Sequence, residues 1–158
     1  MKRFPLTING AEKMRVEIRT LKMEARPRVS QAIAEARAHG DLKENAEYHA
    51  AKDEQGLIEA RIRDLENQLA NAEIIDVARL AGNTKVLFGA IVDLVDEADG
   101  KASRYQIVGE YEADMKQGRI SITSPLARAL IGKVAGDVAT VVLPGGERNM
   151  EVVRVEYV

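Results

Sequence analysis

Residues 39–51, HGDLKENAEYHAA, decide how the first half of the chain folds, because they separate two long helical patterns. On both sides, apolar residues recur three and four positions apart, which indicates a helix with one buried face. The pattern predicts two helices joined by a tight turn, an antiparallel coiled-coil hairpin. The predicted apolar positions are Ala11, Met14, Ile18, Leu21, Ala25, Val29, Ala32, Ile33 and Ala36 in the first helix, and Ala46, Ala50, Leu57, Ile58, Ile62, Leu65, Leu69 and Ala72 in the second.

Four residues predict where these helices bend, end and begin. Pro27 predicts a kink in the first helix, because proline removes one backbone hydrogen bond and clashes with the preceding turn. Gly40 predicts the end of that helix as a C-terminal cap. Asp41 and Glu44 predict the start of the second helix, because Asp-x-x-Glu before an apolar stripe is close to a capping box.

The second half of the chain has a different pattern. From residue 81 onward, β-branched residues and turn signals replace the helical spacing. Ser124 as N-cap, Pro125 at the first helical position and Gly132 at the end predict one short helix. Strands are predicted within residues 86–98, 103–113 and 119–124, with a hairpin within residues 137–158.

The predicted fold class is therefore α+β. A helical hairpin would span residues 1–76 and a linker residues 77–82. Residues 83–158 would form a small domain with an antiparallel sheet and one short helix.

Composition excludes several classes of protein. The sequence has no Cys, which excludes disulfides and Cys-based zinc sites. No apolar run approaches the roughly 20 residues of a membrane span. The first ten residues, MKRFPLTING, lack the apolar run of a secretory signal, so a soluble cytoplasmic protein is expected. The net charge of −2 argues against a protein that coats nucleic acid through its overall charge.

Asp41 and Glu44 have two compatible explanations. They favour a helix start through the capping box and the helix dipole. They would also project together from the far end of the hairpin, and carboxylate oxygens suit Mg²⁺. Two carboxylates are too few for a strong Mg²⁺ site, since the ion prefers six ligands. Another molecule would have to supply the rest.

The neighbouring residues are weaker candidates. Arg37, Lys43 and Lys52 offer a basic side for a phosphate backbone, although solvated helical charges look the same. Tyr48 offers a ring on which a base could stack, although such a ring also packs at helix turns.

Several segments resemble one protein family. The segment AIAEARAHGDLKENAEYHAAKDEQG, residues 32–56, is similar to the signature of the bacterial Gre transcript-cleavage factors, and closest to its A-type members. Residues 124–137, SPLARALIGKVAGD, and the ending VVRVEYV resemble the C-terminal domain of that family. The opening PLTINGAEKMRVEI, residues 5–18, also fits. The resemblance covers essentially the whole chain.

The resemblance implies a cofactor of RNA polymerase and not an enzyme by itself. In this family the coiled coil enters the secondary channel of RNA polymerase, and an FKBP-like C-terminal domain sits at the outer rim of the channel. The factor stimulates the polymerase to hydrolyse the 3′ end of backtracked RNA. A monomer is expected when the factor is functional.

The resemblance also assigns roles to residues. The two tip carboxylates of the family fall on Asp41 and Glu44, which would hold Mg²⁺ jointly with the polymerase. Lys52 stands where an Arg is familiar, so the planar fork is lost. The implied contacts to RNA or polymerase are Arg37, Lys43, Asn45, Tyr48 and Lys52, and those to the polymerase rim are Ser124, Pro125 and Leu126.

Three other functions stay open at this point. An inhibitor paralogue would enter the same channel without promoting cleavage, although the intact GDLKEN at residues 40–45 argues against it. A prolyl isomerase or chaperone would use the FKBP-like domain, but isomerase pockets are lined by aromatics. A coiled-coil adaptor would use the acidic tip only as a cap. Residues 81–158 hold four aromatic side chains, Phe88, Tyr105, Tyr111 and Tyr157.

Overall fold

The computed structural model describes residues 3–40 and 45–158. These residues form two compact units, which are treated one at a time. The first is Ala11–Ala72, and the second combines residues 3–10 with Glu73–Val158. The first strand of the chain and the start of its first helix therefore belong to the β-rich unit.

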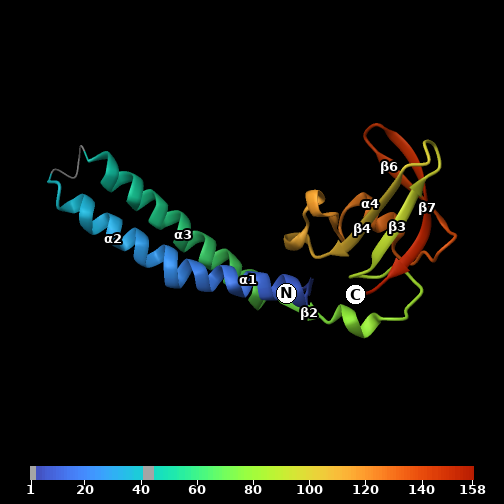
Figure 1. Cartoon of the computed structure of the whole chain (residues 1–158), viewed down its shortest axis with the longest axis horizontal. Helices are drawn as coiled ribbons and strands as arrows, with labels where there is room; N and C mark the ends of the chain where they lie inside the picture. Colours follow the sequence, from blue (N-terminus) through green and yellow to red (C-terminus); the bar gives the residue numbers. More distant parts are fainter. Residues whose placement is uncertain (1–2, 41–44) are drawn as a thin grey trace. The chain divides into compact units, whose positions relative to one another are not determined.

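The first unit is an antiparallel helical hairpin, as predicted. One arm consists of α1 (Ile8–Thr20), a π-helical segment η1 (Leu21–Ala25) and α2 (Arg26–Arg37), and the other is α3 (Ala46–Ala70). Figure 1 shows α2 and α3 running side by side. Val29, Ile58 and Ile62 form its core, with Leu21, Ala25 and Ile33 packed against them.

The irregularity predicted at Pro27 takes the form of this π-helical segment. The N–H of Arg26 donates to the carbonyl of Leu21, five residues back. Pro27 has no N–H, and its ring would clash with the carbonyl four residues earlier in a regular helix. A wider turn directly before the proline accommodates both constraints.

Part of the apolar face predicted for α3 is wrong. Ala46, Ala50 and Leu57 are exposed, and Leu57 is 72% exposed. Ala51 is buried in their place, while the predicted Ile58, Ile62 and Leu65 are buried as expected. Alanine favours a helix whether it is buried or exposed, so Ala46 and Ala50 do not indicate which face of α3 is buried.

Ion pairs between the arms fix the register of the hairpin. Arg61 contacts Glu17 at 2.6 Å, and Arg26 contacts Glu59 at 2.7 Å. Each of these side chains is nearly half exposed, so water screens the attraction and one pair adds little to stability. Their effect is greater on alignment than on stability. Two further pairs among the described residues are Lys22–Glu66 and Arg28–Glu54.

The second unit contains a sheet with strand order β5-β4-β3-β7-β6. The predicted hairpins are confirmed, because β3 pairs with β4 and β6 pairs with β7, both antiparallel. The strands are β3 (Ile91–Asp96), β4 (Ala102–Val108), β5 (Arg119–Ser121), β6 (Val138–Leu143) and β7 (Gly146–Glu156).

The predicted short helix is also confirmed as α4 (Pro125–Leu130). The Ser124 hydroxyl accepts from the N–H of Ala127 at 3.2 Å, and Pro125 opens the helix. Ala127 and Leu130 are buried in the core of the unit together with Val92, Leu94 and other sheet residues. The helix is thus anchored by a polar cap and two apolar side chains.

The sheet is not fully antiparallel, which corrects the prediction. β5 runs parallel to β4, with Ile107 opposite Ile120. Between the two strands lie the short 3₁₀ helices η3 (Glu110–Glu112) and η4 (Met115–Gln117). This connection carries the chain back along β4, so the next strand enters in the same direction.

Residues around the predicted linker are structured. β1 (Phe4–Thr7) pairs with β2 (Ala72–Ile75) in a two-stranded sheet, which the sequence did not indicate. The 3₁₀ helix η2 (Val77–Leu80) follows. Val77 is 7% exposed and belongs to the core cluster of the second unit, so part of residues 77–82 packs as domain structure.

A carboxylate fixes the start of α1. Glu112 accepts from the N–H of Thr7 at 3.0 Å, from the N–H of Gly109 at 2.8 Å and from the Thr7 hydroxyl. The Thr7 hydroxyl in turn accepts from the N–H of Gly10 at 3.0 Å. A Cβ on Gly10 would lie 1.9 Å from Glu112 Oε1, so any larger residue there would force the Glu112 side chain to shift. We call Thr7, Gly10, Gly109 and Glu112 the Glu112 cluster.

Within the described part of the chain, none of the helices has both the length and the apolar character needed to cross a membrane.

Candidate functional site

The predicted tip acids fall in the short connection between α2 and α3. Asp41, Lys43 and Glu44 lie outside the described residues. The described residues on either side are Gly40, which has φ +110°, and Asn45.

The start of α3 corrects the predicted capping box. Its N-cap is Asn45, whose Oδ1 accepts from the N–H of Tyr48 at 3.1 Å. Asn caps a helix about as well as Asp, so the sequence offered two starts of similar quality. The cap of α3 therefore does not require the carboxylates of Asp41 or Glu44.

The end of α2 differs from the prediction by a few residues. The helix ends at Arg37 and its C-cap is Ala38. A tight turn follows, in which the N–H of His39 donates to the Ala36 carbonyl at 3.2 Å. Gly40 supplies the positive φ after this turn, which glycine tolerates best.

Asn45 links the two helices directly. Its Nδ2 donates to the carbonyl of Ala36 at 2.6 Å, while its Oδ1 caps α3. The side chain is half-buried, and both of its polar atoms already hold bonds inside the chain. The predicted contact of Asn45 to RNA or polymerase stays a prediction.

Arg37 and Tyr48 also contact each other across this end of the hairpin. The Arg37 guanidinium lies over the Tyr48 ring, 5.9 Å from its centroid. The Tyr48 ring also contacts the ring of His49, and the two ring centroids are 5.5 Å apart. Tyr48 is half-buried, so packing at the helix turn accounts for much of its surface.

The remaining charged candidates of α3 are exposed. Lys52 Nζ donates to Gln55 Oε1 at 3.3 Å, a surface contact that a partner could displace. Glu47 lies in the first turn of α3 and is exposed. Among the residues that the structure describes, no group of three or more His, Cys, Asp or Glu is arranged to hold a metal ion.

The three rim candidates of the second unit line one cavity. Ser124, Pro125 and Leu126 form part of the wall of a hollow of about 550 Å³. Most of the wall is apolar, and Met115, which is 65% exposed, also borders it. Sequence reasoning missed the other walls, because they come from separate strands and loops. They are Asp96, Tyr105, Ala113, Arg119, Ile120, Ser121, Val141, Leu143, Arg148 and Met150.

One buried carboxylate stands at the edge of this cavity. Asp96 is only 3% exposed, and its Oδ2 accepts from Arg148 at 2.7 Å. The backbone N–H of Ala98, and after it the Arg148 guanidinium, lower the pKa of the Asp96 carboxyl. The pair gives the cavity a polar edge, and Arg148 also lies 4.0 Å from the Asp99 carboxylate.

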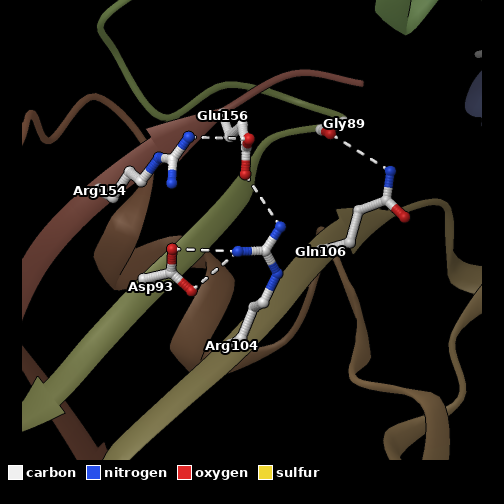
Figure 2. A network of polar contacts seen from close by, with 6 residues as sticks. All are labelled: Gly89, Asp93, Arg104, Gln106, Arg154 and Glu156. Atoms are coloured by element: carbon white, nitrogen blue, oxygen red, sulfur yellow. Dashed lines mark hydrogen bonds and ion pairs between the residues drawn. The ribbon is translucent and has the colours of Figure 1, made fainter.

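A second polar network lies on the sheet and is structural. Figure 2 shows Arg104 between Asp93 and Glu156, at 3.1 Å and 2.9 Å, with Arg154 on the other side of Glu156. These residues tie β4 to β3 and β7. Two acids and two bases balance, so the network leaves no unmatched charge for an ion. Glu156, as the nearest hydrogen-bond partner, raises the pKa of Arg104.

Comparison with known families decides the relationship. Residues 4–74 match the family model described as transcription elongation factor, N-terminal. Residues 81–157 match the model described as transcription elongation factor, GreA/GreB, C-terminal. The chain belongs to the GreA/GreB family of transcription elongation factors. The resemblance seen in the sequence is thereby confirmed over both halves of the chain.

Individual relatives of the GreA/GreB family agree with this assignment. The chain is 62% identical over 158 residues to the transcription elongation factor GreA of Methylococcus capsulatus, with 100% of each chain covered. It is 60% identical over 158 residues to the GreA of Thioalkalivibrio sulfidiphilus, again with 100% of each covered. Among solved structures, GreA factor homolog 1 of Thermus thermophilus is 30% identical, with 98% and 99% coverage and a TM-score of 0.44.

Proposed function

We propose that this chain is a transcription elongation factor that binds RNA polymerase and stimulates its cleavage of backtracked RNA. The observation that carries the proposal is the match of both halves of the chain to GreA/GreB families, with full-length relatives named GreA at about 60% identity. The tip of the hairpin would enter the secondary channel and meet the RNA 3′ end there.

The second unit supplies a surface for binding the polymerase. Its apolar cavity brings Ser124, Pro125 and Leu126 together beside the exposed Met115. An apolar side chain of the polymerase rim that enters this cavity would remove apolar surface from water, at about 25 cal/mol per Å². Binding would then rest on a different unit from the chemistry of the tip.

The hairpin supplies the carboxylates. Asp41 and Glu44 offer hard oxygen ligands suited to Mg²⁺, and the cap of α3 is provided by Asn45 instead. Two carboxylates hold Mg²⁺ weakly, so the polymerase and the RNA phosphate would complete the ligand set. Mg²⁺ held in such a shared site would make a coordinated water more acidic and so a better nucleophile. Asp41 and Glu44 would orient the attacking water by accepting hydrogen bonds.

This division makes the chain a cofactor and not a nuclease by itself. It would act in the cytoplasm as a monomer, because one hairpin fills one channel. The three basic side chains near the tip, Arg37, Lys43 and Lys52, would lie near the RNA backbone and balance its negative charge.

The other functions considered have no observation in their favour. The cavity of the second unit has one aromatic wall residue, Tyr105, whereas isomerase pockets are lined by several. A non-cleaving paralogue would be expected to differ from the family in its tip acids, whereas this sequence keeps GDLKEN intact at residues 40–45, with Asp41 and Glu44.

The test is an RNA cleavage assay on a stalled, backtracked elongation complex. With this protein added, the RNA should lose a 3′ fragment much faster than with polymerase and Mg²⁺ alone. The protein with free RNA and Mg²⁺ should give no cleavage. An unchanged cleavage rate in the backtracked complex would refute the proposed function.

A further inference from the structure

The strongest unexplained feature near the tip is the double use of the Asn45 side chain. Its Nδ2 bonds the Ala36 carbonyl at 2.6 Å and its Oδ1 accepts from the Tyr48 N–H at 3.1 Å. The first bond gives the Ala36 carbonyl, in the last turn of α2, a donor besides the His39 N–H, and the second pairs an N–H in the first turn of α3. One amide group therefore caps both helices.

We propose that Asn45 is a positioning residue that staples the two helices at the tip, and not a contact to RNA or polymerase. The amide is planar, so the two bonds fix the Ala36 carbonyl and the Tyr48 N–H relative to each other. Residue 36 is 2% exposed, which keeps this bond away from competing water. We call the two bonds of Asn45 the tip staple.

A second contact supports the same role. The Arg37 guanidinium over the Tyr48 ring joins the residue after Ala36 to the residue whose N–H is capped. It is a cation–π contact, in which the ring face attracts the positive guanidinium. Two different interactions thus hold the same pair of helix ends together.

The consequence concerns the residues between those ends, and this step rests on the proposed function. Asp41 and Glu44 are joined to the described structure through Gly40 and Asn45. Metal-assisted hydrolysis depends steeply on placement, and a misplacement of about 1 Å can cost about 100-fold in rate. Loosening the tip staple should therefore slow cleavage and raise the Mg²⁺ requirement while leaving the binding surface of the second unit unchanged.

Two variants break the staple and keep the cap. Asn45→Ser retains an N-cap oxygen, since Ser caps about as well as Asn, but loses the donor to Ala36. Asn45→Asp keeps the shape and the cap oxygen and also loses that donor. The matched control is Asn71→Ser, which removes the same kind of bond, Nδ2 to the carbonyl of Asn67 at 2.9 Å, at the other end of α3.

The first measurement is cleavage rate against Mg²⁺ concentration, together with polymerase affinity. Asn45→Ser and Asn45→Asp should cleave about tenfold or more slowly at limiting Mg²⁺, and excess Mg²⁺ should restore part of the rate. Their polymerase affinity should stay within about twofold of the parent, equivalent to less than about 0.5 kcal/mol. Asn71→Ser should match the parent in both.

The second measurement needs no polymerase. The chain has no cysteine, so Ala34→Cys and Asp53→Cys, both at exposed positions, can carry spin labels without background. The distance distribution between the labels should broaden in Asn45→Ser and stay narrow in Asn71→Ser. If the parent failed to stimulate cleavage, the proposed function would fail, and this distance measurement would still decide the staple.

Two results would overturn the proposal. Parental cleavage and a parental distance distribution in Asn45→Ser would show that the bond to Ala36 positions nothing. A loss of polymerase affinity as large as the loss of cleavage would instead make Asn45 a contact residue, as the family resemblance implies.

Discussion

At the scale of single residues, replacing either of two helical glycines by alanine should change the free energy of unfolding in opposite directions. Gly10 lies in α1, where a Cβ would sit 1.9 Å from Glu112 Oε1, whereas Gly56 in α3 has nothing within 4 Å. Ala normally favours a helix over Gly by roughly 0.5–1 kcal/mol. At Gly10 a new Cβ would collide with the Glu112 carboxylate, so alanine should destabilise the fold there although it stabilises the helix at Gly56.

We therefore predict that Gly56→Ala raises the free energy of unfolding by about 0.5–1 kcal/mol. Gly10→Ala should lower it by about 1–3 kcal/mol, because Glu112 must abandon the N–H groups of Thr7 or Gly109. Thermal and urea unfolding of both variants provide the check. Stabilisation by Gly10→Ala would mean that the Glu112 cluster adjusts at no cost.

Asp96 predicts how stability responds to acid. Its pKa is lowered in the folded state, first by the Ala98 N–H and then by Arg148. A group with a depressed folded pKa stabilises the fold above its unfolded pKa of about 3.9, and this contribution is lost as pH falls further toward the folded pKa.

Between about pH 5 and pH 2, the free energy of unfolding should accordingly fall less steeply with decreasing pH in Asp96→Asn than in the parent. Arg148→Gln should give a smaller change in the same direction, because the larger cause, the Ala98 N–H, remains. If the free energy of unfolding of Asp96→Asn fell with pH as steeply as that of the parent, Asp96 would be excluded as a source of acid sensitivity.

At the scale of elements, two neighbouring residues show which face of α3 packs on α2. Ile58 is 8% exposed and belongs to the hairpin core, while its neighbour Leu57 is 72% exposed. Truncating a buried Ile to Ala costs about 2–5 kcal/mol. Ile58→Ala should therefore lower the melting temperature of the hairpin clearly, and Leu57→Ala should change stability by about 0.5 kcal/mol or less. Equal effects would contradict the observed register.

The elements also show what the sequence could predict. Periodicity located the hairpin arms, and turn chemistry located β3 and β4, the β6–β7 hairpin and the Ser124 cap of α4, because these features depend on neighbouring residues. The parallel pairing of β4 with β5 was not predictable, since it depends on how the intervening 3₁₀ turns direct the chain. The pairing of β1 with β2 joins segments far apart in sequence and gave no local signal.

The candidate site shows the same limit. Asn45 satisfies the rule for an N-cap as well as Asp41 does, and only the tertiary bond to Ala36 distinguishes the two starts. The rim candidates were predicted through family resemblance. The cavity that unites them with Met115 is formed by residues from several strands and loops, so no sequence window contains it.

At the scale of the whole molecule, binding and chemistry are assigned to different units and should be separable. Met115 borders the cavity and is 65% exposed, and Val142 is 68% exposed but does not line it. Met115→Glu should reduce polymerase affinity by roughly tenfold or more, equivalent to about 1.4 kcal/mol. Val142→Glu should leave it unchanged.

Cleavage at saturating concentration should recover in Met115→Glu, because its tip residues are intact. Titration of each variant against the elongation complex measures affinity and maximal rate separately. A loss of maximal rate without a loss of affinity would contradict the role given to the cavity.

The central claim is that the tip carboxylates act in chemistry and not in capping. Because Asn45 caps α3, neither Asp41→Asn nor Glu44→Gln should disturb the helix, and both variants should melt within a few degrees of the parent. Glu47→Gln, in the first turn of α3, serves as the control for loss of one negative charge near the tip.

The most direct measurement is the cleavage rate of backtracked RNA at saturating concentrations of these three variants. The account predicts that Asp41→Asn and Glu44→Gln bind polymerase as the parent does and lose nearly all stimulation, because neutral amides are poorer Mg²⁺ ligands than carboxylates. Glu47→Gln should retain most of it. Cleavage by Asp41→Asn at the parental rate would contradict the account.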